Sequence, residues 1–87
     1  MRETGEIELV FDEDADHTTA KASLVIRRVT FTGFGRARRN PADANLPLVG
    51  EELAASRALS DLAHKLIEAA TEAISDSQGG PVRLGDQ

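Results

Sequence analysis

The first half of the sequence alternates apolar and polar residues, and this alternation most constrains what the chain can fold into. Three segments repeat with a period of two, at residues 6–12, 18–27 and 29–38. Successive side chains of a strand point to opposite faces, so this period predicts three strands, each with one buried face. The acidic run at residues 12–16 is expected to form the hairpin loop between the first two.

The same alternation predicts how the second and third strands pair. A turn centred on Arg27 and Arg28 places Leu24 opposite Phe31 and keeps every inward residue inward. A shift of the register by one residue would pair the inward residues of one strand with the outward residues of the other. Two arginines suit a two-residue turn poorly, because such turns favour Asn and Gly. A four-residue loop of the same parity therefore stays open as an alternative.

The second half of the sequence has helical periodicity. Apolar residues that recur at spacings of three and four are expected to face the sheet: Leu59, Leu62, Ala63, Leu66, Ala70, Ala73 and Ile74. Charged residues are expected on the opposite, solvent face: Arg57, Asp61, His64, Lys65, Glu68 and Glu72. We predict a helix over residues 51–76, with Glu51 and Glu52 at its positive end, and glycines 79 and 80 as its stop. A loop at 39–50 precedes it and a tail at 79–87 follows.

Small residues in the middle of the predicted sheet indicate close packing of this helix. Ala20 and Ala22 are expected to pair with Gly35 and Gly33, and glycine inside a strand often marks the close approach of another backbone. We predict one α+β domain over residues 1–87, in two layers: a three-stranded antiparallel meander packed against one long C-terminal helix. Within the loop, residues 48–49 are expected to dock on the core.

Composition excludes several classes of function. A chain of 87 residues supports one small domain, and the absence of cysteine excludes disulfides, thiolate metal sites and thiol nucleophiles. No apolar run approaches the roughly 20 residues of a membrane span, and no secretory signal precedes the first strand. A cytoplasmic location is therefore expected. The net charge of -5 disfavours nucleic acid, whose phosphates attract Lys and Arg.

Two blocks of sequence carry a resemblance to a known family: residues 37–43 (ARRNPAD) and residues 50–64 (GEELAASRALSDLAH). They are similar to a family of short actinobacterial proteins of unknown function, whose fold is grouped with the double-stranded-RNA-binding-domain-like (dsRBD-like) folds. The similarity extends from the first strand to the helix. It implies a sheet backed by a helix and brings no catalytic residues with it.

The contacts that double-stranded-RNA-binding domains use have no counterpart in this sequence. The resemblance implies that such contacts would come from an N-terminal helix, the first hairpin loop and lysines at the start of the last helix. Here the chain starts with a strand, the loop is acidic, and Glu51 and Glu52 stand where lysines would be needed. Because carboxylates repel phosphate, we do not expect this mode of binding.

The outer face of the sheet, away from the helix, carries two candidate surfaces. One is expected to bind a second copy or another protein: Val10, Val25, Phe34, Arg36 and Arg38. The alternative is an arginine-rich site for single-stranded nucleic acid, with Phe34 as a stacking residue: Arg27, Arg28, Arg36, Arg38 and Arg39. Arginines clear of the acidic loop would favour nucleic acid. Arginines neutralised by neighbouring carboxylates would favour protein.

A catalytic function has little support in the sequence. Ser60, Asp61 and His64 have the composition of a triad, but a triad also needs a sheltered pocket with an oxyanion hole. Their spacing also fits surface pairs, Asp61 with Lys65 and His64 with Glu68. We therefore expect a cytoplasmic, non-catalytic interaction or self-association module without cofactor or metal. Weak nucleic-acid binding is the alternative.

Overall fold

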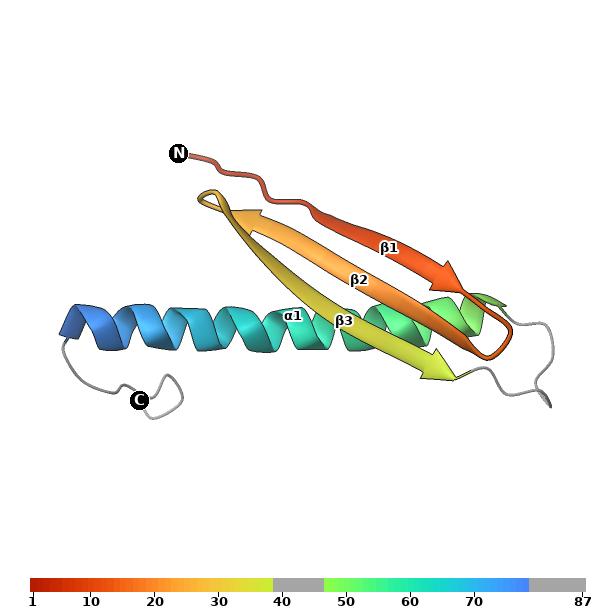
Figure 1. The fold of residues 1–87 in the computed structure, drawn as a ribbon. Helices are drawn as coiled ribbons and strands as arrows, with labels where there is room; N and C mark the ends of the chain where they lie inside the picture. The colour runs from red at the N-terminus through yellow and green to blue at the C-terminus, as the bar shows by residue number, and fades with distance from the viewer. Residues whose placement is uncertain (39–46, 79–87) are drawn as a thin grey trace.

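The chain forms a three-stranded antiparallel sheet followed by one long helix, in a computed structural model that describes residues 1–38 and 47–78 (Figure 1). The strands are β1 (Ile7–Glu13), β2 (His17–Ile26) and β3 (Val29–Arg38), in the order β1-β2-β3, and the helix is α1 (Pro47–Gln78). The predicted two-layer α+β arrangement is confirmed. In the described ranges, no helix combines the length and the apolar character that a bilayer span requires.

The acidic loop between β1 and β2 is held by its own first carboxylate. The backbone N–H groups of Asp16 and His17 both donate to Oδ1 of Asp14, each over 2.7 Å. The N–H of Asp14 donates to the carbonyl oxygen of His17 over 3.0 Å. The two bonds that the Asp14 carboxylate accepts from Asp16 and His17 are the main cause of its lowered pKa. They also explain how a run of acidic residues forms a tight turn.

The turn between β2 and β3 contains only Arg27 and Arg28, so the four-residue alternative is wrong. Ile26 pairs with Val29, and the predicted pairing of Leu24 with Phe31 is confirmed. Arg27 and Arg28 have φ angles of 48° and 69°, which is the left-handed conformation that a two-residue hairpin turn demands. Arginine has no intrinsic preference for that conformation, so the strand pairing imposes it.

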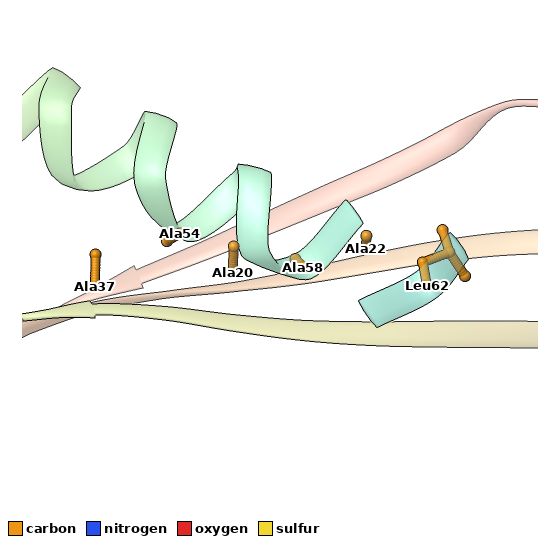
Figure 2. Close-up of a cluster of buried hydrophobic side chains, with 6 residues drawn as sticks. All are labelled: Ala20, Ala22, Ala37, Ala54, Ala58 and Leu62. Carbon is orange, nitrogen blue, oxygen red and sulfur yellow. The ribbon is translucent and has the colours of Figure 1, made fainter. Parts of the chain in front are cut away.

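The core lies where α1 crosses β2 and β3, and it is built mostly from alanine (Figure 2). Its buried apolar members are Ala20, Ala22, Ala37, Ala54, Ala58 and Leu62. Opposite them, Gly33 and Gly35 leave no room for a side chain: a Cβ on Gly33 would lie 2.5 Å from the backbone N of Leu62. The predicted close approach of helix to sheet is confirmed.

Three predictions about the helix are wrong. It begins at Pro47 rather than at residue 51, because proline is well suited to the first turn of a helix. Glu51 and Glu52 therefore lie after the first turn, and Leu48 and Val49 are exposed helical residues that do not dock on the core. The rest of the predicted loop, residues 39–46, and the tail at 79–87 lie outside the described residues.

The buried stripe of α1 also differs from the predicted one. Ala54, Ala58 and Leu62 make the contact, whereas four of the expected inward residues are exposed: Leu59, Ala63, Ala70 and Ala73. The reason is the glycine surface of β3, because its close contact with the helix backbone at Ala54, Ala58 and Leu62 determines which helix face is buried. The hydrophobic period alone predicted Leu62 correctly but missed Ala54 and Ala58.

The helix leaves β1 uncovered. Ile7, Leu9 and Phe11, on the face of β1 that the alternation predicts to be buried, are 48%, 37% and 37% exposed. A helix is about 10 Å wide and strands lie about 4.8 Å apart, so one helix covers about two strands. Because α1 packs against β3 and β2, the inner face of β1 lies beyond its reach.

Candidate functional site

The free edge of β3 is closed by three side chains of α1. Arg57 Nη1 donates to the carbonyl oxygen of Arg36 over 2.6 Å, and Lys65 Nζ donates to that of Thr32 over 2.7 Å. Between them, the N–H of Phe34 donates to Oδ2 of Asp61 over 2.8 Å. An edge strand with unpaired backbone groups is a template for association, and here three of the outward groups in the middle of the strand already have partners.

The spacing of these three side chains matches that of the strand groups they bind. They lie four residues apart on α1, a rise of about 6 Å. Their backbone partners lie two residues apart on β3, a rise of about 6.7 Å. Reasoning from the sequence missed this arrangement and placed all three side chains on the solvent face. A usable signal would be charged residues spaced four apart on a helix, because their rise matches that of alternate residues on a strand.

Asp61 is the centre of this arrangement. The Phe34 N–H is the main cause of its lowered pKa, followed by the hydrogen bond from Lys65, whose Nζ lies 3.1 Å from the carboxylate. Lys65 Nζ also lies 5.3 Å from the centre of the Phe34 ring, a cation–π distance. The Asp61 carboxylate thus binds the sheet and does not orient His64 as a catalytic triad would require. His64 Nε2 lies 3.5 Å from Oε1 of Glu68 instead.

The free edge of β1 has no such closure. Backbone groups in an antiparallel ladder turn alternately to one side and the other. On β3, the backbone N–H of Phe34 points away from β2, because it bonds α1. When this alternation is followed through the two strand registers, the backbone N–H and C=O groups of Ile7, Leu9 and Phe11 point to the outer edge of β1. A bond from Thr19 Oγ1 to the Asp12 carbonyl, 3.3 Å long, agrees with this alternation. Within residues 1–38 and 47–78, no strand pairs with this edge.

The side chains of these same three residues form an apolar surface. Ile7, Leu9 and Phe11 lie on the helix side of the sheet, on the strand that α1 does not cover. Leu59, also exposed, lies on the flank of α1 opposite the one that binds the β3 edge, because it is displaced from Arg57 and Asp61 around the helix. We call Ile7, Leu9 and Phe11, with their backbone groups, the β1 edge.

The predicted outer-face surface is exposed but not continuous. Val10, Lys21 and Phe34 form one cross-strand row, so a lysine separates the two apolar side chains. Val25 lies two rows away, near the turn. Phe34, although 60% exposed, already carries Lys65 beside its ring. This face is therefore mixed in polarity.

The predicted arginine site is divided between the two ends of β3. Arg27 and Arg28 occupy the turn, while Arg36 and Arg38 lie near the other end, about 27 Å away along the strand. Arg36 lies close enough to the acidic loop to contribute, after the backbone bonds from Asp16 and His17 and the charge of His17, to the lowered pKa of Asp14. Arg39 lies outside the described residues.

Comparison with known proteins places the chain in a family. The sequence model of the Rv2632c-like family matches residues 3–83. The uncharacterized protein Mb1767 of Mycobacterium bovis is 41% identical over 78 residues, which cover 90% of this chain and 83% of the relative. Rv2632c of Mycobacterium tuberculosis is 39% identical over 79 residues, which cover 91% of this chain and 85% of the relative.

A solved structure agrees with these matches. The crystal structure of Rv2632c superposes with a TM-score of 0.84 at 37% sequence identity, covering 93% of this chain and 96% of the other. The similarity carries a fold and a family, and the names of these relatives state no activity. The chain belongs to the Rv2632c-like family, in agreement with the resemblance to a small actinobacterial family.

Proposed function

We propose that this protein is a small cytoplasmic, non-catalytic interaction module that binds another polypeptide along the β1 edge. The observation that carries the proposal is the difference between the two edges of its sheet. One edge has three backbone groups bonded by Arg57, Asp61 and Lys65, and the other has open backbone groups beside apolar side chains.

An open edge of this kind suits the addition of a strand. Main-chain hydrogen bonds supply affinity, and alternate side chains supply specificity. On β1, Ile7, Leu9 and Phe11 would meet apolar side chains of the added strand on the helix side. Glu8 and Val10 would meet its side chains on the outer face.

This proposal moves the interaction surface from the outer face to the β1 edge. The outer face has Val10 and Phe34 separated by Lys21, and Phe34 has an intramolecular partner in Lys65. The β1 edge has three apolar side chains in alternate positions on one strand. Arg36 and Arg38 then serve as exposed charges that keep the sheet soluble.

Nucleic-acid binding remains the alternative function and has weaker support. Its arginines are split between the ends of β3, and Arg36 lies near the carboxylate of Asp14. Fluorescence anisotropy with labelled single- and double-stranded RNA, at about 50 and 200 mM salt, tests it directly. Binding that weakens steeply with salt would favour this alternative over the proposed module.

Site-specific photo-crosslinking in the producing cell tests the proposal itself. A photoreactive amino acid is placed at Leu9, with a matched control at Thr30, which is exposed on the outer face of β3. We expect discrete adducts from position 9 and none from position 30, and mass spectrometry identifies the captured chain. Equal labelling at both positions, or no adduct at position 9, would contradict binding through the β1 edge.

A further inference from the structure

We infer that the β1 edge binds the β1 edge of a second copy of this chain, antiparallel, with Leu9 facing Leu9 across a twofold axis. This inference rests on the proposed function and names the partner of the same site. It follows from three properties of β1: which backbone groups are open, which side chains would then face each other, and what happens to the remaining sheet edges.

The first property is the parity of the open groups. In a hydrogen-bonded antiparallel pair, both residues turn their N–H and C=O groups toward each other. The open groups of β1 belong to the odd-numbered residues Ile7, Leu9 and Phe11. Two copies of β1 can therefore pair only with odd residues opposite odd residues, and every such pair brings helix-side side chains together.

The second property is self-complementarity in one register. Centred on Leu9, the pairing sets Leu9 opposite Leu9, Ile7 opposite Phe11 and Glu8 opposite Val10. No acidic residue then faces another within residues 7–11, and every apolar residue of the β1 edge faces an apolar residue. Aliphatic–aromatic cross-strand pairs of this kind stabilise sheets.

The neighbouring registers fail on charge or polarity, beginning with the one centred on Glu8, which sets Glu8 opposite Glu8. A pairing centred on Val10 sets Glu8 opposite Asp12 twice, and sets Ile7 opposite Glu13. A pairing centred on Phe11 sets Leu9 opposite Glu13. Like charges directly opposite destabilise a sheet, and an acid opposite Ile7 or Leu9 removes an apolar contact from the β1 edge. The register centred on Leu9 is thus the favoured one.

The third property is closure. Pairing through β1 gives a six-stranded sheet whose two outer strands are both β3, each with its edge bonded by Arg57, Asp61 and Lys65 of its own helix. Both helices lie on the same face, with Ile7, Leu9 and Phe11 of the two copies between them. Both β1 edges are then used, and the β3 edges that remain are partly capped by their own helices, which favours an assembly of two copies.

One like-charge contact survives at each end of this arrangement. Just beyond residues 7–11, Glu6 of one copy faces Asp12 of the other. Added salt screens such a repulsion, so we expect the dimer to tighten between about 50 and 500 mM salt. This is the opposite of the salt dependence of nucleic-acid binding.

Solution mass and a cysteine scan test the inference on the purified chain. Light scattering is expected to give twice the mass of one chain at about 200 µM, with dissociation on dilution. Leu9→Lys is expected to give a monomer that stays folded by circular dichroism, because Leu9 lies outside the core. Val25→Lys, an equal change on the outer face, is expected to keep the dimer.

The register is read from single cysteines in this cysteine-free chain. Leu9→Cys is expected to form a disulfide-linked dimer under mild oxidation faster than Val10→Cys or Phe11→Cys, because only position 9 faces itself. Glu6→Lys would meet Asp12 of the second copy and is expected to tighten the dimer about fivefold. Glu3→Lys is its control, because it makes the same change in net charge.

A monomer at about 200 µM, or faster crosslinking at position 10 or 11, would overturn the inference. The results that would overturn the proposed function differ from those that would overturn the dimer. A monomeric chain that crosslinks from Leu9 to a different protein in the cell would keep the β1 edge as an interaction site and remove the second copy as its occupant. A monomer without any adduct at Leu9 would remove both.

Discussion

Replacing Gly33 with alanine tests whether the close approach of α1 to β3 holds the two layers together. The new Cβ would lie 2.5 Å from the backbone N and 2.8 Å from the Cα of Leu62, and closer still to the carbonyl oxygen of Ala58. These atoms belong to the helix backbone, so no side-chain rotation relieves the clash. To bring the contact with Leu62 N alone from 2.5 Å to an ordinary 3.4 Å, the helix must move by at least about 0.9 Å.

The energetic cost follows from the size of this displacement. A gap of 0.5–1 Å removes about a quarter to a half of the dispersion energy of the contacts involved. Burial of Leu62 and the five core alanines contributes about 6 kcal/mol, at about 2 for the leucine and 0.8 for each alanine. The helix movement therefore costs about 2–3 kcal/mol, offset by about 0.5 kcal/mol from the lower flexibility of alanine in the unfolded chain.

The net loss of about 2 kcal/mol corresponds to a fall in Tm of about 8–16 °C for a domain of this size. Thermal unfolding followed by circular dichroism measures it. Gly5→Ala is the matched control: its Cβ would meet Leu24 Cδ1 at 3.5 Å, an ordinary contact, and its Tm is expected to stay within about 3 °C of the wild type. A Gly33→Ala variant as stable as Gly5→Ala would refute the close packing.

The remaining predictions concern the β3 edge and the two turns. The lowered pKa of Asp61 means that its ionised form stabilises the fold above the unfolded value of 3.8, and that this contribution is lost as pH falls through the folded pKa. The Tm difference between wild type and Asp61→Asn should therefore be widest near neutral pH and shrink in acid, and a constant difference would contradict this. Changing Arg27 and Arg28 to Asn and Gly should stabilise the protein by about 1–2 kcal/mol in denaturant unfolding, because the positive φ angles no longer oppose the side chains; an unchanged midpoint would count against strain in this turn. Asp14→Ala should lower the Tm more than Asp16→Ala, because Asp14 alone accepts both turn bonds, and equal effects would show that those bonds are dispensable.

Strand pairing was predictable because local sequence determines it. Alternation sets the face of every residue, and Gly33 opposite Ala22 can face a helix only in one register. The conformation of the Arg27–Arg28 turn was not predictable from its residues, which disfavour it. It follows from the strands on either side, since their parity and length leave only two residues to connect them.

The candidate site was harder to predict because it depends on which strands the helix covers. Alternation marked Ile7, Leu9 and Phe11 as half-buried, but one helix reaches only about two strands, and the glycines draw it to β3. The roles of Arg57, Asp61 and Lys65 depend on the same placement. On an isolated helix these residues read as surface ion pairs. Only beside a strand edge do they become partners of its backbone.

Residue-resolved amide hydrogen exchange tests the central claim most directly, because it compares the two sheet edges in one experiment. In dilute solution, the account predicts slow exchange for the N–H of Phe34, which donates to Asp61, and fast exchange for Leu9 and Phe11 at the β1 edge. Raising the protein concentration should slow Leu9 and Phe11 and leave Phe34 unchanged. Fast exchange at Phe34, or slow exchange at Leu9 in a demonstrably monomeric sample, would contradict a closed β3 edge and an open β1 edge.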